Sequence, residues 1–214
     1  MIRTIRSGVK NLIPRSLLIR TLSTPADNRL LLTFDDGPDP EVTPGVLERL
    51  QAFNARGVFF VVGRLAEAGP ELLTRIRDEG HILGNHTYTH ENAGDPPFLA
   101  YKRDVARCQD VVHKATGLTP TLFRPPKGHL SATSLLVPKL LGLRTVNWTL
   151  GVRDWACRTG EEAAAAAATL EERAAPGQII VLHDDNRFLL QILDQVLPVF
   201  RERGYDLASA AAGL

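Results

Sequence analysis

The sequence is poor in cysteine, in net charge and in long apolar runs, and each shortage excludes a class of protein. Its two cysteines, Cys108 and Cys157, are too few for a disulfide scaffold. A formal net charge of +1 gives no overall electrostatic basis for binding nucleic acid. No stretch approaches the roughly 20 consecutive apolar residues that a membrane-spanning helix needs. The 214 residues are instead long enough for one substantial core, which favours a single α/β domain.

Basic residues are concentrated in an N-terminal segment, residues 1–29. Five of them precede the first acidic residue, Asp27, and stand among apolar residues: Arg3, Arg6, Lys10, Arg15 and Arg20. The segment lacks a secretory signal, because Pro14, Arg15 and Arg20 interrupt its apolar run and no small-residue cleavage site follows. Two interpretations stay open: residues 1–20 contact an anionic membrane surface, or they form a basic arm packed on the domain. We expect a cytoplasmic protein, membrane-peripheral in the first case, and nothing indicates an obligate protein partner.

From residue 30 onward, short apolar runs alternate with helical patterns, which is typical of βα units around a parallel sheet or barrel. Residues 30–214 are therefore predicted to form one domain. Strands are expected near Leu30 to Phe34, Val58 to Val62, Ile82 to Asn85, Thr121 to Phe123, Thr145 to Trp148, Ile179 to Leu182 and, as a weak last one, Asp206 to Ala208. Each cluster of polar residues follows one of these strands. In a parallel barrel all such strand ends lie on one rim, where these folds keep their active sites.

Two separate fragments carry the clearest chemical signal. Residues 33–38, Thr-Phe-Asp-Asp-Gly-Pro, place adjacent carboxylates where an apolar strand breaks at a Gly-Pro turn. Residues 85–90, Asn-His-Thr-Tyr-Thr-His, space two imidazoles at i, i+4, which predicts that one helical turn presents both on one side. Either fragment alone is more often a solvated turn or a pair of surface histidines. Their occurrence together, each directly after an apolar run, favours a metal site.

The predicted ligands are Asp36, His86 and His90. Two nitrogens and one oxygen leave coordination positions open for water and substrate, which is a catalytic arrangement. A divalent ion held there acidifies water and polarises a carbonyl oxygen. Zn²⁺ is the first choice for imidazole and carboxylate ligands, and Co²⁺, Ni²⁺ or Mn²⁺ are the substitutes.

Four further residues supply acid–base chemistry beside these ligands. Asp35 is left to act as a base, and a guanidinium from Arg124 would hold it ionised. His183 would protonate a departing amine, with Asp154 holding its ring and raising its pKa.

Five ordered fragments resemble the motifs of the polysaccharide deacetylases, the NodB-homology group of carbohydrate esterase family four. They are the two fragments above together with Phe123-Arg124-Pro125-Pro126, Arg153-Asp154-Trp155 and Ile180-Val181-Leu182-His183-Asp184. The resemblance runs from about Leu30 to the C-terminus. It implies a distorted (β/α)7 barrel of parallel strands, with the active site at the C-terminal rim. It also implies metal-dependent hydrolysis of N-acetyl, or sometimes O-acetyl, groups on sugars.

By this resemblance, each candidate residue has a role. Asp35 is the base, Arg124 orients it, His183 is the acid, Asp154 tunes the acid, and the three predicted ligands hold the ion.

Three positions depart from the motifs of the family. Lys127 stands where tyrosine is usual, so its backbone N–H still serves the oxyanion but an aromatic groove wall is lost. Val181 replaces the usual leucine near the pocket for the acetyl methyl group, and Gly151 occupies an often acidic place. Trp155, beside Asp154, is expected to line that pocket or a sugar subsite, with plain core as the alternative.

The leading prediction is a deacetylase acting on N-acetylated amino sugars of a polysaccharide or oligosaccharide. An amidase or deformylase of the same fold, acting on a sugar-lipid or a small amide, is the nearest alternative. A non-catalytic glycan-binding module is the third, and the presence of Asp35, His183 and all three ligands argues against it, because binding needs neither acid nor base.

Overall fold

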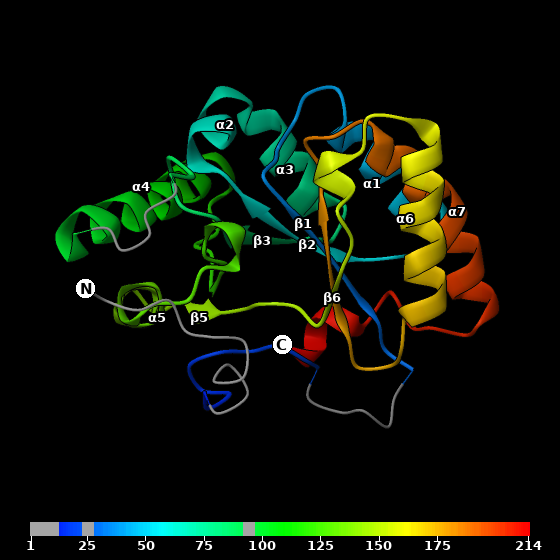
Figure 1. Cartoon of the computed structure of the whole chain (residues 1–214). Helices are drawn as coiled ribbons and strands as arrows, with labels where there is room; N and C mark the ends of the chain where they lie inside the picture. The colour runs from blue at the N-terminus through cyan, green and yellow to red at the C-terminus, as the bar shows by residue number, and fades with distance from the viewer. Residues whose placement is uncertain (1–12, 23–27, 92–96) are drawn as a thin grey trace.

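The computed structural model describes residues 13–22, 28–91 and 97–214, and Figure 1 shows their arrangement. Seven parallel strands form one sheet in the order β5-β4-β3-β2-β1-β7-β6. The strands are β1 (Leu31–Asp35), β2 (Gly57–Val61), β3 (Ile82–Asn85), β4 (Leu122–Phe123), β5 (Arg144–Thr145), β6 (Leu150–Gly151) and β7 (Ile179–His183). This curled parallel sheet confirms the predicted distorted (β/α)7 barrel.

Helices connect the strands and cover the outside of the sheet (Figure 1). They are α1 (Thr43–Ala52), α2 (Gly63–Ala68), α3 (Pro70–Asp78), α4 (Phe98–Thr116), α5 (Ala132–Leu140), α6 (Gly160–Arg173) and α7 (Phe188–Glu202). Short 3-10 turns are η2 (Pro126–Gly128), η3 (Asp154–Ala156) and η4 (Ala210–Gly213). Within the described ranges, no helix combines the length and the apolarity that crossing a bilayer requires.

The central strands are buried on both faces, as expected for a parallel sheet covered by helices. Every residue of β1 and β2 is buried. On the outer face, Phe34 stacks on Phe59 at a ring distance of 4.7 Å and joins the cluster formed with α1 and α7. On the inner face, Val58 and Phe60 pack with apolar residues of β4, β7 and η4. This two-sided burial fixes the strand ends that carry the site.

The described part of the N-terminal segment packs against the sheet. Ile19 forms a parallel bridge with Val146, directly after β5, and Thr21 an antiparallel bridge with Gln178, directly before β7. Leu18, Ile19 and Leu22 are buried. These residues therefore connect the end of β5 with the start of β7. Arg3, Arg6 and Lys10 lie outside the described residues, so membrane contact through residues 1–20 and a cytoplasmic location stay predictions.

Two elements differ from the expectation. The segment near Asp206 to Ala208 is no strand; it contributes a single bridge between Asp206 and Arg29. The seventh strand is instead β6, whose two residues give no apolar run to recognise. Cys108 and Cys157 are both free thiols, and both are buried.

Candidate active site

The carboxyl ends of the strands surround a cavity of about 550 Å³. Asp35 ends β1 and His183 ends β7, and the two are neighbours across the sheet. Eight of the predicted site residues line the cavity: Asp35, Asp36, His86, His90, Lys127, Trp155, Val181 and His183. The other two, Arg124 and Asp154, are fully buried and contact lining residues. The structure thus brings all ten together.

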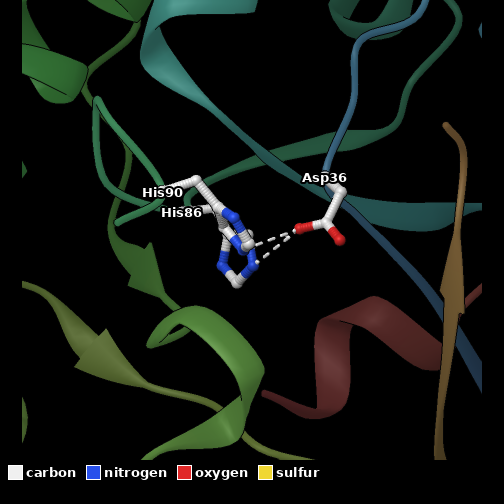
Figure 2. A group of neighbouring side chains, drawn as sticks. All are labelled: Asp36, His86 and His90. Atoms are coloured by element: carbon white, nitrogen blue, oxygen red, sulfur yellow. Dashed lines mark ion pairs between the residues drawn. The ribbon is translucent and has the colours of Figure 1, made fainter. Parts of the chain in front are cut away.

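Three of these side chains converge as metal ligands would (Figure 2). Nε2 of His86 and Nε2 of His90 lie 3.3 and 3.0 Å from Oδ1 of Asp36, and the three ligand atoms lie within 4.8 Å of one another. Oδ1 of Asp36 and Nε2 of His90 are buried without a hydrogen-bond partner. Burial alone would raise the pKa of Asp36, but the two imidazoles outweigh it and hold that pKa well below its usual range. A divalent cation fits this cluster, because it would satisfy the unpaired atoms.

The predicted helical turn between His86 and His90 is wrong. The histidines stand on an irregular loop after β3, where Thr87 and His90 adopt positive φ angles of 66° and 56°. Local hydrogen bonds hold this loop: the Thr87 N–H donates to Oδ1 of Asn85, and the His90 N–H donates to Oγ1 of Thr87. The i, i+4 spacing therefore brings the rings together, 4.9 Å apart, through loop geometry.

A second set of contacts, which the sequence analysis did not predict, holds the same loop against α4 and α2. The carboxylate of Asp104 on α4 accepts hydrogen bonds from the Tyr88 and Thr89 N–H groups, at 3.2 Å each. The Gly63 N–H at the start of α2 donates to the Thr87 carbonyl. A Cβ at Gly63 would lie 2.7 Å from Cδ2 of Tyr88, so the close approach requires glycine. No motif signals Asp104, because its partners are backbone groups.

The orientation of the His86 ring is fixed by the chain itself. Its Nδ1 lies 2.7 Å from the Arg124 carbonyl, which can only accept a hydrogen bond. Nδ1 therefore carries the hydrogen, so in the neutral ring the lone pair of Nε2 is available to bind a cation. Ligating histidines are commonly oriented in this way, by a hydrogen bond from the other ring nitrogen.

Asp35 is paired with a buried guanidinium. Nη1 of Arg124 donates to Oδ1 of Asp35 and to Oγ1 of Thr33, both at 2.7 Å. The guanidinium also lies 4.2 Å from the centre of the Phe60 ring. Burial lowers the pKa of Arg124 from its usual value, and the charge of Asp35 opposes this effect. The pair holds one carboxylate oxygen of Asp35 in place and leaves the other, Oδ2, 3.9 Å from Nε2 of His86.

His183 and Asp154 form the second buried pair. The two oxygens of Asp154 accept from the His183 backbone N–H at 2.6 Å and from Nδ1 at 3.0 Å. Burial alone would lower the pKa of His183, but Asp154, with the charges of Asp35 and Asp36, raises it to about 9. The imidazole is therefore protonated near neutral pH, with Nδ1 bound to Asp154.

Two more residues that the sequence analysis gave no role support the strand ends. Nδ2 of Asn186 donates to the carbonyls of Asp154, Trp155 and Cys157, and so fixes the η3 turn. Asp184 is buried and accepts a hydrogen bond from Oγ1 of Thr43, while burial raises its pKa to about 7. Neither side chain could have been found from spacing, because their partners are 29 or more residues away in the sequence.

Comparison with known proteins places the chain in a family. The polysaccharide deacetylase family model matches residues 23–146, more than half of the chain. A peptidoglycan-N-acetylglucosamine deacetylase from Bacillus cereus is 32% identical over 177 residues, which cover 81% of this chain and 63% of the relative. A chitooligosaccharide deacetylase from Azorhizobium caulinodans is 35% identical over 199 residues, covering 86% of this chain and 93% of the relative.

A solved structure agrees with these matches. The crystal structure of a peptidoglycan N-acetylglucosamine deacetylase in complex with 4-naphthalen-1-yl-N-oxidanyl-benzamide has a TM-score of 0.83 and 25% sequence identity, covering 94% of this chain and 92% of that one. The chain nevertheless spans less than two thirds of the length of its Bacillus cereus relative. From its sequence, its fold and its site, the chain belongs to the polysaccharide deacetylase family.

Proposed function

We propose that the chain is a metal-dependent hydrolase that removes acetyl groups from N-acetylated amino sugars of a polysaccharide or oligosaccharide. One observation carries this proposal: a single cavity brings together three converging ligand atoms, a carboxylate paired with a buried arginine, and an imidazole paired with a buried carboxylate. Amide hydrolysis needs a base for the water and an acid for the amine, and the two pairs supply both.

Asp36, His86 and His90 would hold the ion. A divalent ion bound there supplies electrophilic polarisation of a carbonyl oxygen and makes water more acidic. Zn²⁺ is the first choice, because imidazole and carboxylate ligands suit it, and Co²⁺, Ni²⁺ or Mn²⁺ are the substitutes.

Asp35 takes the proton of the attacking water in this proposal. The ion pair with Arg124 fixes this carboxylate toward the cavity. Arg124 is therefore a positioning residue, since its guanidinium is fully buried behind Asp35. The Lys127 backbone N–H is our candidate for binding the oxyanion, because this residue lines the same cavity.

His183 gives its proton to the departing amine nitrogen. Its raised pKa of about 9 keeps the imidazole charged before the reaction. Asp154 accepts from Nδ1, so Nε2 is the nitrogen that remains to donate toward the substrate. The C–N bond breaks as nitrogen gains this proton, and the products are acetate and a free amino sugar.

The substrate class rests on the relatives as well as on the cavity. By their names, the Bacillus cereus relative acts on N-acetylglucosamine of peptidoglycan and the Azorhizobium caulinodans relative acts on chitooligosaccharides. Trp155, which is 49% exposed, offers an aromatic face to a sugar ring at the cavity wall. Val181, which lines the same cavity, is our candidate for contacting the acetyl methyl group.

A substrate screen tests this function and its alternatives. Metal-loaded protein would be assayed for acetate and formate release from chitooligosaccharides, peptidoglycan fragments, acetylated xylan and sugar-lipids. We expect acetate and free amine in equal amounts from an N-acetylated glycan. Release of formate alone would favour the deformylase alternative, and binding without release from any substrate would favour a glycan-binding module.

A further inference from the structure

Two cationic side chains line the cavity beside the residues of the proposed reaction. Lys127 stands on the η2 turn and Arg153 directly precedes the η3 turn, so they come from different strand ends. Both are exposed, and within the described ranges neither forms an ion pair with an acidic side chain. The Arg153 guanidinium lies 5.4 Å from the centre of the Trp155 ring, a contact that leaves its N–H donors available.

The acidic side chains of the cavity do not cancel this charge. Asp35 is paired with Arg124, and Asp36 is one of the three proposed metal ligands, so a bound divalent ion would oppose its charge. Asp185 also lines the cavity, and it is the one other acid of the described lining. This leaves one acidic side chain beside the two cationic ones, so the charge of the remaining lining is positive.

Two departures from the family motifs both make this cavity more positive. Lys127 adds a cation where tyrosine is usual, and Gly151 removes a side chain where an acid is frequent. Both residues line the cavity. A Cβ on Gly151 would lie 2.6 Å from Cγ1 of Val181, so this backbone leaves no room for an acidic side chain. The absence of an acidic side chain at position 151 is therefore tied to the local packing.

We infer that Lys127 and Arg153 form a subsite for an anionic group, a carboxylate or a phosphate, carried by the glycan close to its acetamido group. The arginine fork matches the paired oxygens of either group, and the lysine ammonium adds a point charge. The inference rests on the proposed function for its reaction, and it narrows the substrate from N-acetylated glycans in general to acidic ones.

Matched substrates and variants test this subsite. Acetate release would be measured on chitotetraose, on peptide-free glycan strands with free muramic acid carboxylates, on the same strands with those carboxylates converted to methyl amides, and on a phosphorylated chitooligosaccharide. We expect kcat/KM to be higher for an acidic strand than for its neutral counterpart. Lys127→Met should lower this acidic-to-neutral ratio about three- to tenfold, mainly through KM. Arg153→Met should also lower the acidic-to-neutral ratio, whereas Lys127→Arg, which keeps the charge, should retain the wild-type ratio.

Controls separate charge recognition from general damage. Lys139→Met removes an exposed lysine of α5, outside the cavity lining, and should leave the ratio unchanged. The preference should shrink between 10 mM and 1 M salt, as the Debye length falls from about 30 to about 3 Å. If kcat/KM is higher for the strands with free carboxylates than for the amidated strands, the subsite recognises a carboxylate. If only the phosphorylated chitooligosaccharide is preferred, the subsite recognises a phosphate. If wild type and Lys127→Met have the same acidic-to-neutral ratio of kcat/KM, the inference is overturned.

A binding measurement keeps this test independent of turnover. Calorimetric Kd values for the same acidic and neutral ligands, measured with the Asp35→Asn protein, should show the same preference and the same loss in a Lys127→Met background. If the preference in binding is present but no substrate releases acetate, the proposed reaction fails and the subsite stands. If acetate is released without any preference, the reaction stands and the subsite fails.

Discussion

Replacing Asp154 with asparagine removes the charge that keeps His183 protonated. Asp154 is fully buried, and its two oxygens accept from the backbone N–H and from Nδ1 of His183. Asparagine keeps the size of the side chain but carries no charge. The burial of His183, which lowers its pKa, is then opposed only by the charges of Asp35 and Asp36. We expect the pKa of His183 to fall from about 9 to its usual 6.5 or below.

This fall of roughly 2.5 units corresponds to about 3 kcal/mol of lost preference for the charged ring. At pH 8, most wild-type His183 would still be protonated, whereas about 3% or less would be protonated in the variant. The protonation state alone therefore predicts a loss of activity of at least about 30-fold at that pH. Asparagine also offers a single acceptor oxygen to the two N–H groups of His183, so one of the two contacts is lost and the ring is held less firmly.

The assay is the pH profile of kcat/KM for acetate release between pH 5 and 10. We expect the basic limb of the wild-type profile near pH 9 and that of Asp154→Asn near pH 6.5 or lower. Asp185→Asn, which removes a neighbouring carboxylate not bonded to His183, is the matched control and should shift the limb much less. An Asp154→Asn profile with lower amplitude but an unmoved basic limb would refute His183 as the acid.

The same pair links stability to pH. The folded-state pKa of His183 is raised above its unfolded value, so the stabilisation is fully present below about pH 6.5 and is lost as the pH rises through about 9. In metal-free protein, the Tm difference between wild type and Asp154→Asn should therefore be largest below pH 6.5 and narrow by pH 9.5. A difference that stays constant across this range would contradict the raised pKa.

Three further predictions concern the ion and the base. His86→Ala and His90→Ala should each lose the ion in metal analysis of the purified protein; undiminished metal in both would reject the ligand assignment. Asp35→Asn should lower turnover on the order of 10² to 10⁴ while the ion stays bound. Near-normal turnover would show that Asp35 is not the base. Loss of the ion would show that Asp35 is a ligand and Asp36 the base. Asp104→Asn should weaken the affinity for the ion by about 10- to 100-fold in a chelator competition titration, because two N–H groups of the loop lose their carboxylate acceptor. An unchanged affinity would mean that the other hydrogen bonds of the loop suffice.

Most of the sheet was predictable because its central strands are apolar on both faces. The predicted strand at Ile82 to Asn85 coincides with β3, and the expected pairing of Arg124 with Asp35 is present at 2.7 Å. Strand ends in a parallel sheet share one edge, so a motif at each end predicts a common site. Charge pairing inside a buried site follows from residue type alone.

The remaining features depend on contacts that residue types do not reveal. The i, i+4 spacing of His86 and His90 predicts a helical turn, but Thr87 and His90 take left-handed backbone angles, and hydrogen bonds to the side chains of Asn85 and Thr87 hold the loop. Asp104 lies on α4, and its carboxylate accepts a hydrogen bond from the loop between the two histidines. The sequence around Asp104 indicates only a long helix. The β6 strand is two residues long and owes its existence to pairing with β7.

The most direct test of the central claim is a titration of chelator-stripped protein with Zn²⁺, followed by the release of acetate from an N-acetylated glycan. The account predicts no release from the stripped protein, and activity that rises to a plateau at one ion per chain. It also predicts equal amounts of acetate and free amine. Full activity in the stripped protein, or a plateau reached equally by His86→Ala, would contradict a metal-dependent deacetylase centred on Asp36, His86 and His90.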